Sequence, residues 1–292
     1  MNQYSVRDVF DTAYEHPRRA LLVPALMFLA AAGVLLASYA TDGAALEKGI
    51  DFTGGTEVHI PVTGDVSPGA VEAAFGGEAS ARTMSGGGTQ WVIVETKQTY
   101  NQDGVARLLS DAGIPFDQDT GLSIRTLGAA VGSAFFREAQ LAAAAALLIM
   151  SIVIFVAFRS IVPSLAVILA AVTDMLVALA GMAVLGIDLT LGSLAALLML
   201  LGYSVDTDIL LSTRVLKQSK GDLADRIWSS VATGSTMTIA AIAAFAVLFV
   251  VSPSSTLDQI AAVIVIGLAA DLPITWLGNA FILKWHVERD GV

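Results

Sequence analysis

Six long apolar runs constrain this chain more than any other feature of its sequence. The runs are residues 20–40, 139–158, 163–185, 189–211, 232–251 and 260–282. Each is close to the ~20 apolar residues that a helix needs to cross a bilayer. Apolar side chains surround each run instead of lining one face, so neither an amphipathic helix nor an alternating strand fits. Only 14% of the residues are charged. The sequence therefore predicts a polytopic α-helical membrane protein with six transmembrane helices.

Basic residues near the ends of these runs indicate how the chain is oriented. If the N-terminus is cytoplasmic, ten of them lie inside, and the loops at 186–188 and 252–259 carry none. The ten are Arg7, Arg18, Arg19, Arg159, Arg214, Lys217, Lys220, Arg226, Lys284 and Arg289. We therefore expect both termini in the cytoplasm. The first run is longer than the apolar core of a signal peptide, about 7–15 residues, so we expect an anchor and not a cleaved leader.

One sizeable polar segment, residues 41–138, separates the first two runs. Its pattern predicts a strand at 57–62, a helix at 67–77, a strand or hairpin that includes 89–96, a helix at 101–113 and a strand at 122–128. This order is that of a ferredoxin-like α+β sandwich. We expect three parts: residues 1–40 with the first helix, an extracytoplasmic ferredoxin-like domain at 41–138, and a five-helix transmembrane bundle at 139–292.

The composition excludes several classes of function. Residues 41–138 carry 13 acidic and six basic side chains, a balance that repels nucleic acid. Cysteine is absent and the three histidines lie in unrelated segments, so we expect no metal site. The chain lacks a phosphate-binding glycine loop and a catalytic triad, and we expect neither a cofactor nor enzymatic catalysis. The lipid bilayer is the partner that the apolar runs require.

Four aspartates lie inside the apolar runs without a Lys or Arg at similar depth: Asp174, Asp206, Asp208 and Asp271. An ionised Asp at the centre of a membrane helix costs ~2.5–3.5 kcal/mol, which favours the protonated form. We therefore predict a proton relay or intramembrane polar centre, built on Asp206 with Asp174 and Asp271.

Two neighbouring features refine this prediction. Asp206 and Asp208 are separated by ~200° of helix rotation, so they face nearly opposite ways. One can face the bundle while the other meets lipid head groups, Arg214 or a partner subunit. Pro273 is expected to loosen the helix after Asp271. An alternative stays open, in which these acids only bond to nearby Ser, Thr and Tyr hydroxyls as packing contacts.

Several segments resemble a known family. Residues 49–56, "GIDFTGGT", resemble a signature of the SecD/SecF protein-export family, with Gly49, Asp51, Gly54 and Gly55 at its marked positions. Taken alone, these glycines indicate a tight turn that enters a strand. Residues 131–160 resemble the second span of the family and residues 173–215 its third and fourth spans. The tripeptide Gly202-Tyr203-Ser204 is typical of the SecF branch, and the form of residues 205–215 resembles archaeal members.

The resemblance implies an accessory subunit in the cytoplasmic membrane. It would pair with SecD, join the Sec translocon (SecY/SecE) and assist the export of polypeptides, within the resistance-nodulation-division superfamily. Bacterial relatives couple export to the proton motive force through a fourth-span Asp and a fifth-span Arg. The Asp corresponds to Asp206 and a third-span acid to Asp174, but Ala232 or a small polar residue replaces the Arg.

Two further functions stay open at this point. A stand-alone small-solute exporter of the same superfamily would work as a homodimer, because six spans are half of the usual twelve. A purely structural scaffold for SecD would need none of the four aspartates. If protonation drives motion, we expect residues 125–138 to pass it to the outer domain.

Overall fold

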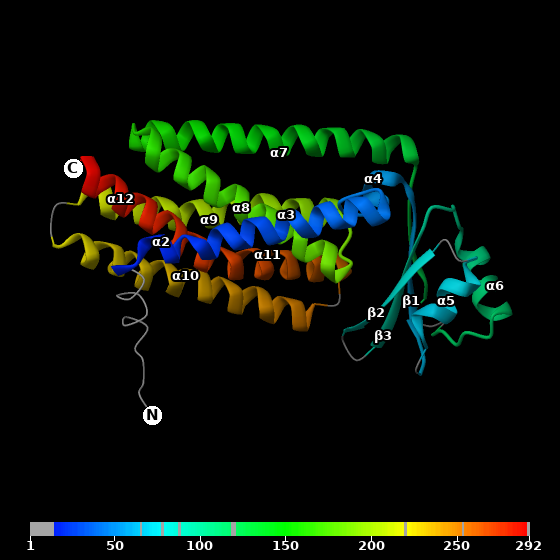
Figure 1. The fold of residues 1–292 in the computed structure, drawn as a ribbon. Helices are drawn as coiled ribbons and strands as arrows, with labels where there is room; N and C mark the ends of the chain where they lie inside the picture. Colours follow the sequence, from blue (N-terminus) through cyan, green and yellow to red (C-terminus); the bar gives the residue numbers. More distant parts are fainter. Residues whose placement is uncertain are drawn as a thin grey trace, which may run out of the picture.

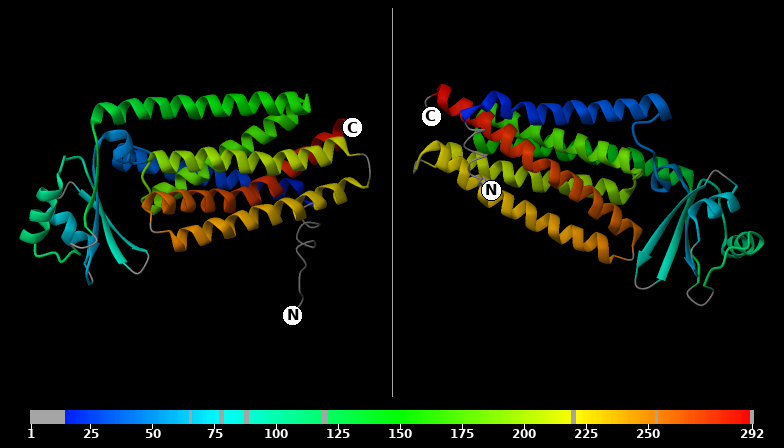
Figure 2. Two further views of the ribbon diagram at one scale, coloured as in Figure 1. Left: turned by 180° about the vertical axis from the view of Figure 1, so that it is seen from behind. Right: turned by 60° about the horizontal axis from the view of Figure 1, so that its bottom comes forward.

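The computed structural model describes residues 15–64, 66–76, 79–86, 89–117, 121–218, 221–252 and 254–290. Its long helices form an elongated bundle, and a small domain of strands and short helices sits at one end of it (Figure 1). Two other directions of view show the same separation (Figure 2). We call the part of the bundle next to this sheet domain the domain end, and the opposite part the far end.

Six helices in the described part of the chain are long and apolar enough to cross a membrane. The helical elements outside the sheet domain are α2 (Pro17–Ala20), α3 (Leu22–Asp42), α4 (Ile50–Thr53), α7 (Ala129–Phe158), α8 (Ile161–Leu185), α9 (Leu191–Lys217), α10 (Leu223–Val251), α11 (Ser255–Ile274), η1 (Thr275–Asn279) and α12 (Ala280–Asp290). The sixth membrane helix runs continuously through α11, the π-helix η1 and α12. The six predicted spans are confirmed, with α7 beginning at Ala129 and extending its run toward the sheet domain.

Burial divides these helices into a centre and a periphery. In α8, α9 and the α11–α12 helix, 44–56% of the most apolar stretch is buried within the chain, against 6–11% in α3, α7 and α10. α11 packs against α8, α9 and α10, and α3 packs against α8. The three central helices therefore build the interior of the bundle, and the peripheral helices present most of their surface to lipid or to another protein.

The sheet domain has the predicted ferredoxin-like order. Its strands β1 (Gly55–Val62), β2 (Ala79–Gly86), β3 (Thr89–Thr96) and β4 (Ser123–Leu127) form an antiparallel sheet in the order β2-β3-β1-β4. The helices α5 (Pro68–Ala74) and α6 (Gln102–Asp111) cover one face. Side chains from alternate strand positions meet these helices in the core, which includes Val58, Ile60, Val71, Val92, Val94, Val105 and Leu109.

The other face of the sheet carries charged side chains beside apolar ones and points toward the bundle. Glu57 and His59 alternate with the core residues of β1, and Glu57 pairs in register with Glu95 of β3 and with Arg125 of β4. Arg82 of β2 lies on the same face, because its register partner Ile93 is two residues from Glu95. Charged side chains thus stand where the sheet domain meets the bundle.

Candidate functional site

Three aspartates from three helices converge in the middle of the bundle. Asp174 on α8, Asp208 on α9 and Asp271 on α11 are each at most 1% exposed. Each lies near the middle of its membrane helix, where a bilayer is driest. Asp174 interacts electrostatically with both of the others. We call these three side chains the carboxyl centre.

Two of the carboxyls accept short hydrogen bonds from α9 and η1. The Ser204 hydroxyl donates to Asp174 Oδ2 at 2.5 Å. The Asn279 amide donates to Asp208 Oδ1 at 2.6 Å. These bonds join α8 to α9 and α9 to η1 through the interior of the bundle.

Two threonines, Thr275 and Thr207, lie close to the carboxyl oxygens of Asp271. Thr275 Oγ1 lies 3.0 Å from Asp271 Oδ1 and 3.2 Å from Asp208 Oδ1, and its single hydrogen can donate to only one of them at a time. Thr207 Oγ1 lies 3.4 Å from Asp271 Oδ2 but only 2.7 Å from the backbone oxygen of Ser204. Of the hydroxyls that the sequence offers as packing partners, Ser204 and Thr207 therefore contact the acids.

These donors are too few for three charged carboxylates. Asp174 Oδ1 and Asp208 Oδ2 are buried and have no hydrogen-bond partner among the described residues. None of the ion pairs found within the described ranges includes a member of the carboxyl centre. A buried charge that lacks a partner is strongly unfavourable, and the centre offers too few donors to satisfy three ionised side chains.

A π-helix brings two of the donors into place. Pro273, inside α11, cannot donate a backbone hydrogen bond, and the helix widens into η1 directly after it. Thr275 and Asn279 are the first and last residues of η1. The sequence predicts that Pro273 loosens this helix, but it does not by itself single out Thr275 and Asn279. The four-residue spacing of Asp271, Thr275 and Asn279 is the signal that could have revealed them.

The structure corrects the predicted place of Asp206. Asp208, not Asp206, lies in the carboxyl centre, while Asp206 is exposed on the outer surface of α9. The predicted ~200° between them holds, because one faces the interior and the other faces away. Sequence distance to the helix end does not reveal which residue faces inward. That choice depends on how α9 packs against α8 and α11.

Asp206 shares its surface with other exposed residues of α9. Met199 and Tyr203 are 43% and 40% exposed, and Gly202 is exposed as well. No described residue forms a hydrogen bond or ion pair with Asp206. We call these four residues the α9 stripe.

Two alternatives for the surroundings of Asp206 can be settled here. Arg214 Nη1 is turned toward α10, where it donates to Ser229 O at 2.6 Å and to Thr233 Oγ1 at 3.0 Å. It therefore does not meet Asp206. Ala232, which stands where the resemblance implies a fifth-span Arg, is exposed. The residues of the Gly202-Tyr203-Ser204 tripeptide face different ways. Gly202 and Tyr203 belong to the α9 stripe, and Ser204 bonds to the carboxyl centre.

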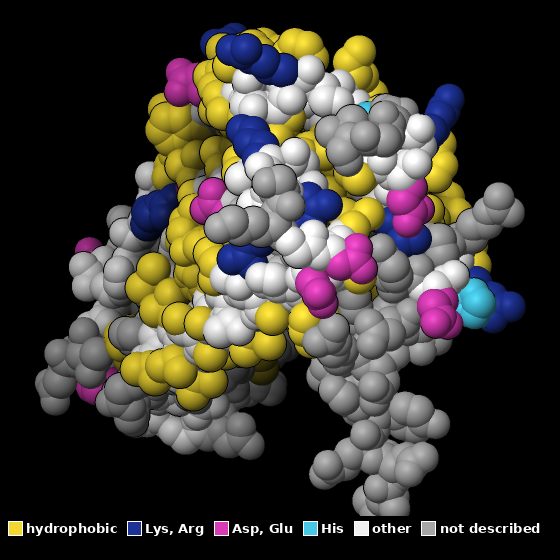
Figure 3. Space-filling view, turned by 90° about the vertical axis from the view of Figure 1, so that its left-hand side faces the viewer, with side chains coloured by type: hydrophobic (Ala, Val, Ile, Leu, Met, Phe, Trp, Pro, Cys, Tyr) yellow, Lys and Arg dark blue, Asp and Glu magenta, His cyan; other side chains and the backbone are white. Residues whose placement is uncertain are grey.

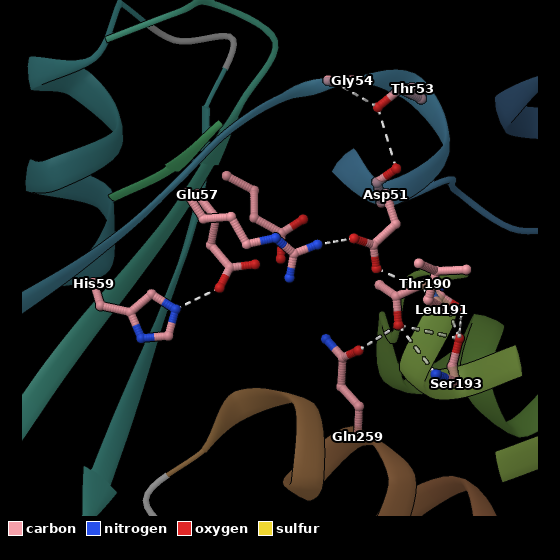
Figure 4. A network of polar contacts seen from close by, with 12 residues as sticks. Asp51, Thr53, Gly54, Glu57, His59, Thr190, Leu191, Ser193 and Gln259 are labelled. Carbon is pink, nitrogen blue, oxygen red and sulfur yellow. Dashed lines mark hydrogen bonds and ion pairs between the residues drawn. The ribbon is translucent and has the colours of Figure 1, made fainter. Parts of the chain in front are cut away.

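The "GIDFTGGT" segment lies at the junction of sheet domain and bundle (Figure 4). Asp51 on α4 accepts a hydrogen bond from the backbone N–H of Leu191, the first residue of α9, at 2.9 Å and forms an ion pair with Arg125 of β4. The N–H of Gly49 donates to Leu189 O at 2.9 Å. The tight turn expected from the glycines is present, and it also fastens β1 and β4 to the start of α9.

Two glycines of this segment have backbone angles that favour glycine. Gly54 has φ +75° and Gly55 has φ +141°. A Cβ on Gly54 would lie 2.5 Å from Ala129 at the start of α7, and one on Gly55 would lie 2.3 Å from Thr96 O in β3. The segment therefore permits close approach of β1 to both α7 and β3.

Comparison with known proteins places this architecture in a family. The model for the protein export membrane protein SecD/SecF C-terminal region matches residues 114–289. A protein-export membrane protein SecF from Haloferax volcanii is 37% identical over 98% of both chains. A SecF from Methanothermobacter thermautotrophicus is 48% identical over 171 residues, which cover 57% of this chain and 60% of that protein.

A solved structure has the same fold. The crystal structure of SecDF from Thermus thermophilus, described as a translocon-associated membrane protein, superimposes with a TM-score of 0.73 at 20% identity. The alignment covers 92% of this chain but only 38% of the SecDF chain. Six apolar helices and relatives of this kind identify a multi-pass membrane protein. The chain belongs to the SecD/SecF family of protein-export membrane proteins.

Proposed function

We propose that this chain is the SecF-type subunit of a protein-export complex in the cytoplasmic membrane. It pairs with SecD and acts beside the SecY/SecE translocon on exported polypeptides. The supporting observation is the match to relatives named as protein-export SecF along essentially the whole chain. The small-solute exporter of the same superfamily is not favoured, because the curated relatives are named for protein export.

A separate SecD subunit accounts for two structural features. This chain aligns with 38% of the SecDF chain, and we propose that SecD corresponds to part of the remainder. Asp206 lies eleven residues before Lys217 at the end of α9, or ~16 Å along the helix, and therefore at a lipid-exposed depth. A carboxylate there is costly unless another protein covers it. We therefore assign the α9 stripe as the contact surface for SecD.

The carboxyl centre is the part of this subunit that responds to protons. Asp174, Asp208 and Asp271 are held by three different helices, and their bonds cross between those helices. Adding or removing a proton changes how many donors the centre requires, and so changes the preferred packing of α8, α9 and α11. This coupling replaces the contribution that the resemblance assigned to a fifth-span Arg.

The far end of the bundle is the cytoplasmic side. Lys and Arg side chains gather on this end of the molecule (Figure 3). The described basic residues at helix ends there are Arg19, Arg159, Arg214, Lys217, Arg226, Lys284 and Arg289. Positively charged residues favour the cytoplasmic side, so both termini lie inside and residues 41–138 lie outside.

The decisive experiment compares Asp208→Asn with Asp206→Asn in cells that secrete a reporter protein. We expect Asp208→Asn to reduce the rate of reporter export by about tenfold or more while SecD still copurifies. Asp206→Asn should weaken retention of SecD by roughly thirtyfold, the equivalent of ~2 kcal/mol for a buried interface charge.

The two variants change the same helix by the same chemistry, so each controls for the other. Unimpaired export by Asp208→Asn at normal protein level would remove the carboxyl centre from the mechanism. Purification of a self-contained homodimer without SecD, with solute-stimulated proton flux, would favour the exporter. If Asp→Asn variants of all four intramembrane aspartates export the reporter normally, the chain acts only as a structural scaffold for SecD.

A further inference from the structure

One helix reaches both the carboxyl centre and the sheet domain. α9 begins at Leu191, in the junction, and carries Ser204 and Asp208 in the bundle interior. Leu191 and Ser204 are separated by ~20 Å along the helix axis. A change in helix packing at the carboxyl centre can therefore be transmitted to the sheet domain through one rigid helix.

Two sets of contacts hold the start of α9 to the sheet domain, and we call them fastenings. Asp51 makes the first. Its carboxylate caps the first N–H of α9 and pairs with Arg125 of β4 (Figure 4). An acidic group at a helix N-terminus is stabilised by the orphan N–H groups and by the helix dipole. The backbone strengthens this contact, because Leu189 donates to Glu47 O at 2.8 Å just before α9 begins.

The second fastening runs through Gln259 on α11. Its side-chain amide lies 2.9 Å from Thr190 Oγ1, the N-cap of α9. With the amide nitrogen toward Thr190, the amide oxygen accepts from the Arg82 guanidinium at 3.1 and 3.2 Å. Arg82 in turn donates to Glu95 Oε1 at 3.0 Å. Thr190 also forms a capping box with Ser193, so this chain of bonds ends on a fixed helix terminus.

Arg82 is the cation shared by the two sides of the junction. It acts on Glu95 in the sheet domain and on Asp188 in the loop before α9. Burial raises the pKa of both carboxyls, and the charge of Arg82 opposes that rise. Without Arg82, carboxylates of the sheet domain and of the bundle would face each other uncompensated.

The segment of α9 between the junction and the carboxyl centre is closely packed. Ala196, Leu197 and Leu200 are buried against Met182 and Val263 of the neighbouring helices. A Cβ on Gly267 of α11 would lie 2.2 Å from Leu200, so α9 and α11 approach too closely for an extra methyl group. Such an interface shifts as a unit and does not absorb a displacement locally.

From these contacts we propose that Asp51, Arg82 and Gln259 are positioning residues that couple the sheet domain to the carboxyl centre through α9. The proposal rests on the proposed function of the centre. It differs from the predicted link through residues 125–138, because it runs through noncovalent contacts of α9 and not along the chain. Breaking either fastening should leave the centre able to titrate but unable to move the sheet domain.

The test uses the full chain in lipid nanodiscs. Because the sequence has no cysteine, Ala112→Cys on the sheet domain and Val247→Cys on α10 give two unique exposed sites for nitroxide labels. Pulsed electron paramagnetic resonance measures the distance between the labels at neutral and acidic pH. Infrared difference spectra of the same samples follow the carboxylic-acid band and report protonation independently.

Five backgrounds are compared. In the unsubstituted pair we expect the infrared band and the label distance to change together with pH. Asp208→Asn should diminish both changes. Asp51→Ala and Gln259→Ala should retain the infrared change and lose more than half of the distance change. Gln98→Ala, at an exposed glutamine of the sheet domain, is the matched control and should behave like the unsubstituted pair.

The pH response of titratable groups at the junction must be distinguished from that of the carboxyl centre. Those that face the junction are Glu47, Asp51, Glu57, His59, Glu95, Asp188 and Asp258, beside Arg82 and Arg125. The sharpest control is His59→Gln, which should leave the distance change intact. Gln259→Glu keeps an acceptor for Arg82 and should restore the change that Gln259→Ala removes.

Each result decides between the two proposals. An undiminished distance change in both Asp51→Ala and Gln259→Ala, with the infrared change present, overturns the coupling through α9 and leaves the proton-responsive centre standing. An infrared change with pH that is identical in the unsubstituted pair and in Asp208→Asn overturns the proposed function and the coupling together. A distance change abolished by His59→Gln overturns the coupling by assigning the pH response to the junction itself.

Discussion

Glu57 and Glu95 sit opposite each other on neighbouring strands, yet they respond to their surroundings in opposite directions. Burial alone would raise the pKa of Glu57, but the hydrogen bond and charge of His59, with Arg125 and Arg82, outweigh it and hold the pKa below 4.5. Burial raises the pKa of Glu95 above 4.5, because only Arg82 opposes it and other carboxylates add to it. Which carboxyl carries the charge is decided by the cations that each side chain reaches.

These directions predict how acidity changes stability. The lowered pKa of Glu57 gives stability that is present above 4.5 and lost as pH falls through the folded value. The raised pKa of Glu95 makes stability fall as pH rises from 4.5 through the folded value. In calorimetric unfolding, Glu57→Gln should no longer lose stability as pH falls below 4.5. Glu95→Gln should no longer lose stability as pH rises above 4.5. Identical pH profiles for the two variants would contradict both assignments.

The sequence reveals which residues are unusual but not which way they point. Four intramembrane acids could be selected because charge is rare in apolar runs. Assigning Asp208 to the interior and Asp206 to the surface required the packing of α9 against α8 and α11. The partners Thr275 and Asn279 carry no charge, so the criterion that selects the aspartates does not select them, although both follow Asp271 at four-residue spacing.

At the scale of elements, close packing between α9 and α11 makes glycine necessary at position 267. A Cβ on Gly267 would lie 2.2 Å from the Cδ2 atom of Leu200, which is fully buried. Gly202, on the exposed surface of α9, has no heavy atom within 4 Å of a Cβ built there. The two helices are thus held together by a contact that tolerates no added volume.

Gly267→Ala should therefore destabilise the purified chain by ~1–3 kcal/mol through overpacking. Gly202→Ala, which also replaces a helical glycine by alanine, should leave stability unchanged or raise it slightly. The midpoint of thermal unfolding in one detergent measures both. A Gly267→Ala protein as stable as the parent would show that Leu200 has room to move.

Elements with strong local signals could be predicted, and those that depend on neighbours could not. The six membrane helices follow from run length, and α5 and α6 from their N-caps, Ser67 and Asn101. The edge strand β2 has few β-branched residues, and it forms because β3 provides a pairing partner. The ferredoxin-like order came from the sequence of elements, whereas the polar face of the sheet became meaningful only opposite the bundle.

At the scale of the whole molecule, the absence of cysteine allows the orientation to be tested with single engineered thiols. Thr99→Cys in the sheet domain and Gln218→Cys after α9 are both exposed positions. In intact cells, a membrane-impermeant maleimide should label Thr99→Cys, and it should reach Gln218→Cys only after permeabilisation. The opposite labelling pattern would place the sheet domain in the cytoplasm.

The dispersal of the junction along the chain has a consequence for biogenesis. Asp51 is synthesised before Arg125 and Leu191, and Gln259 is synthesised last. The contacts of the junction can therefore form only after these later segments have been made. The sheet domain can fold early, but α9 acquires its full set of restraints only once α11 has entered the bilayer. Truncation before that helix should yield a nascent protein whose sheet domain is folded yet loosely tethered, a natural substrate for membrane quality control.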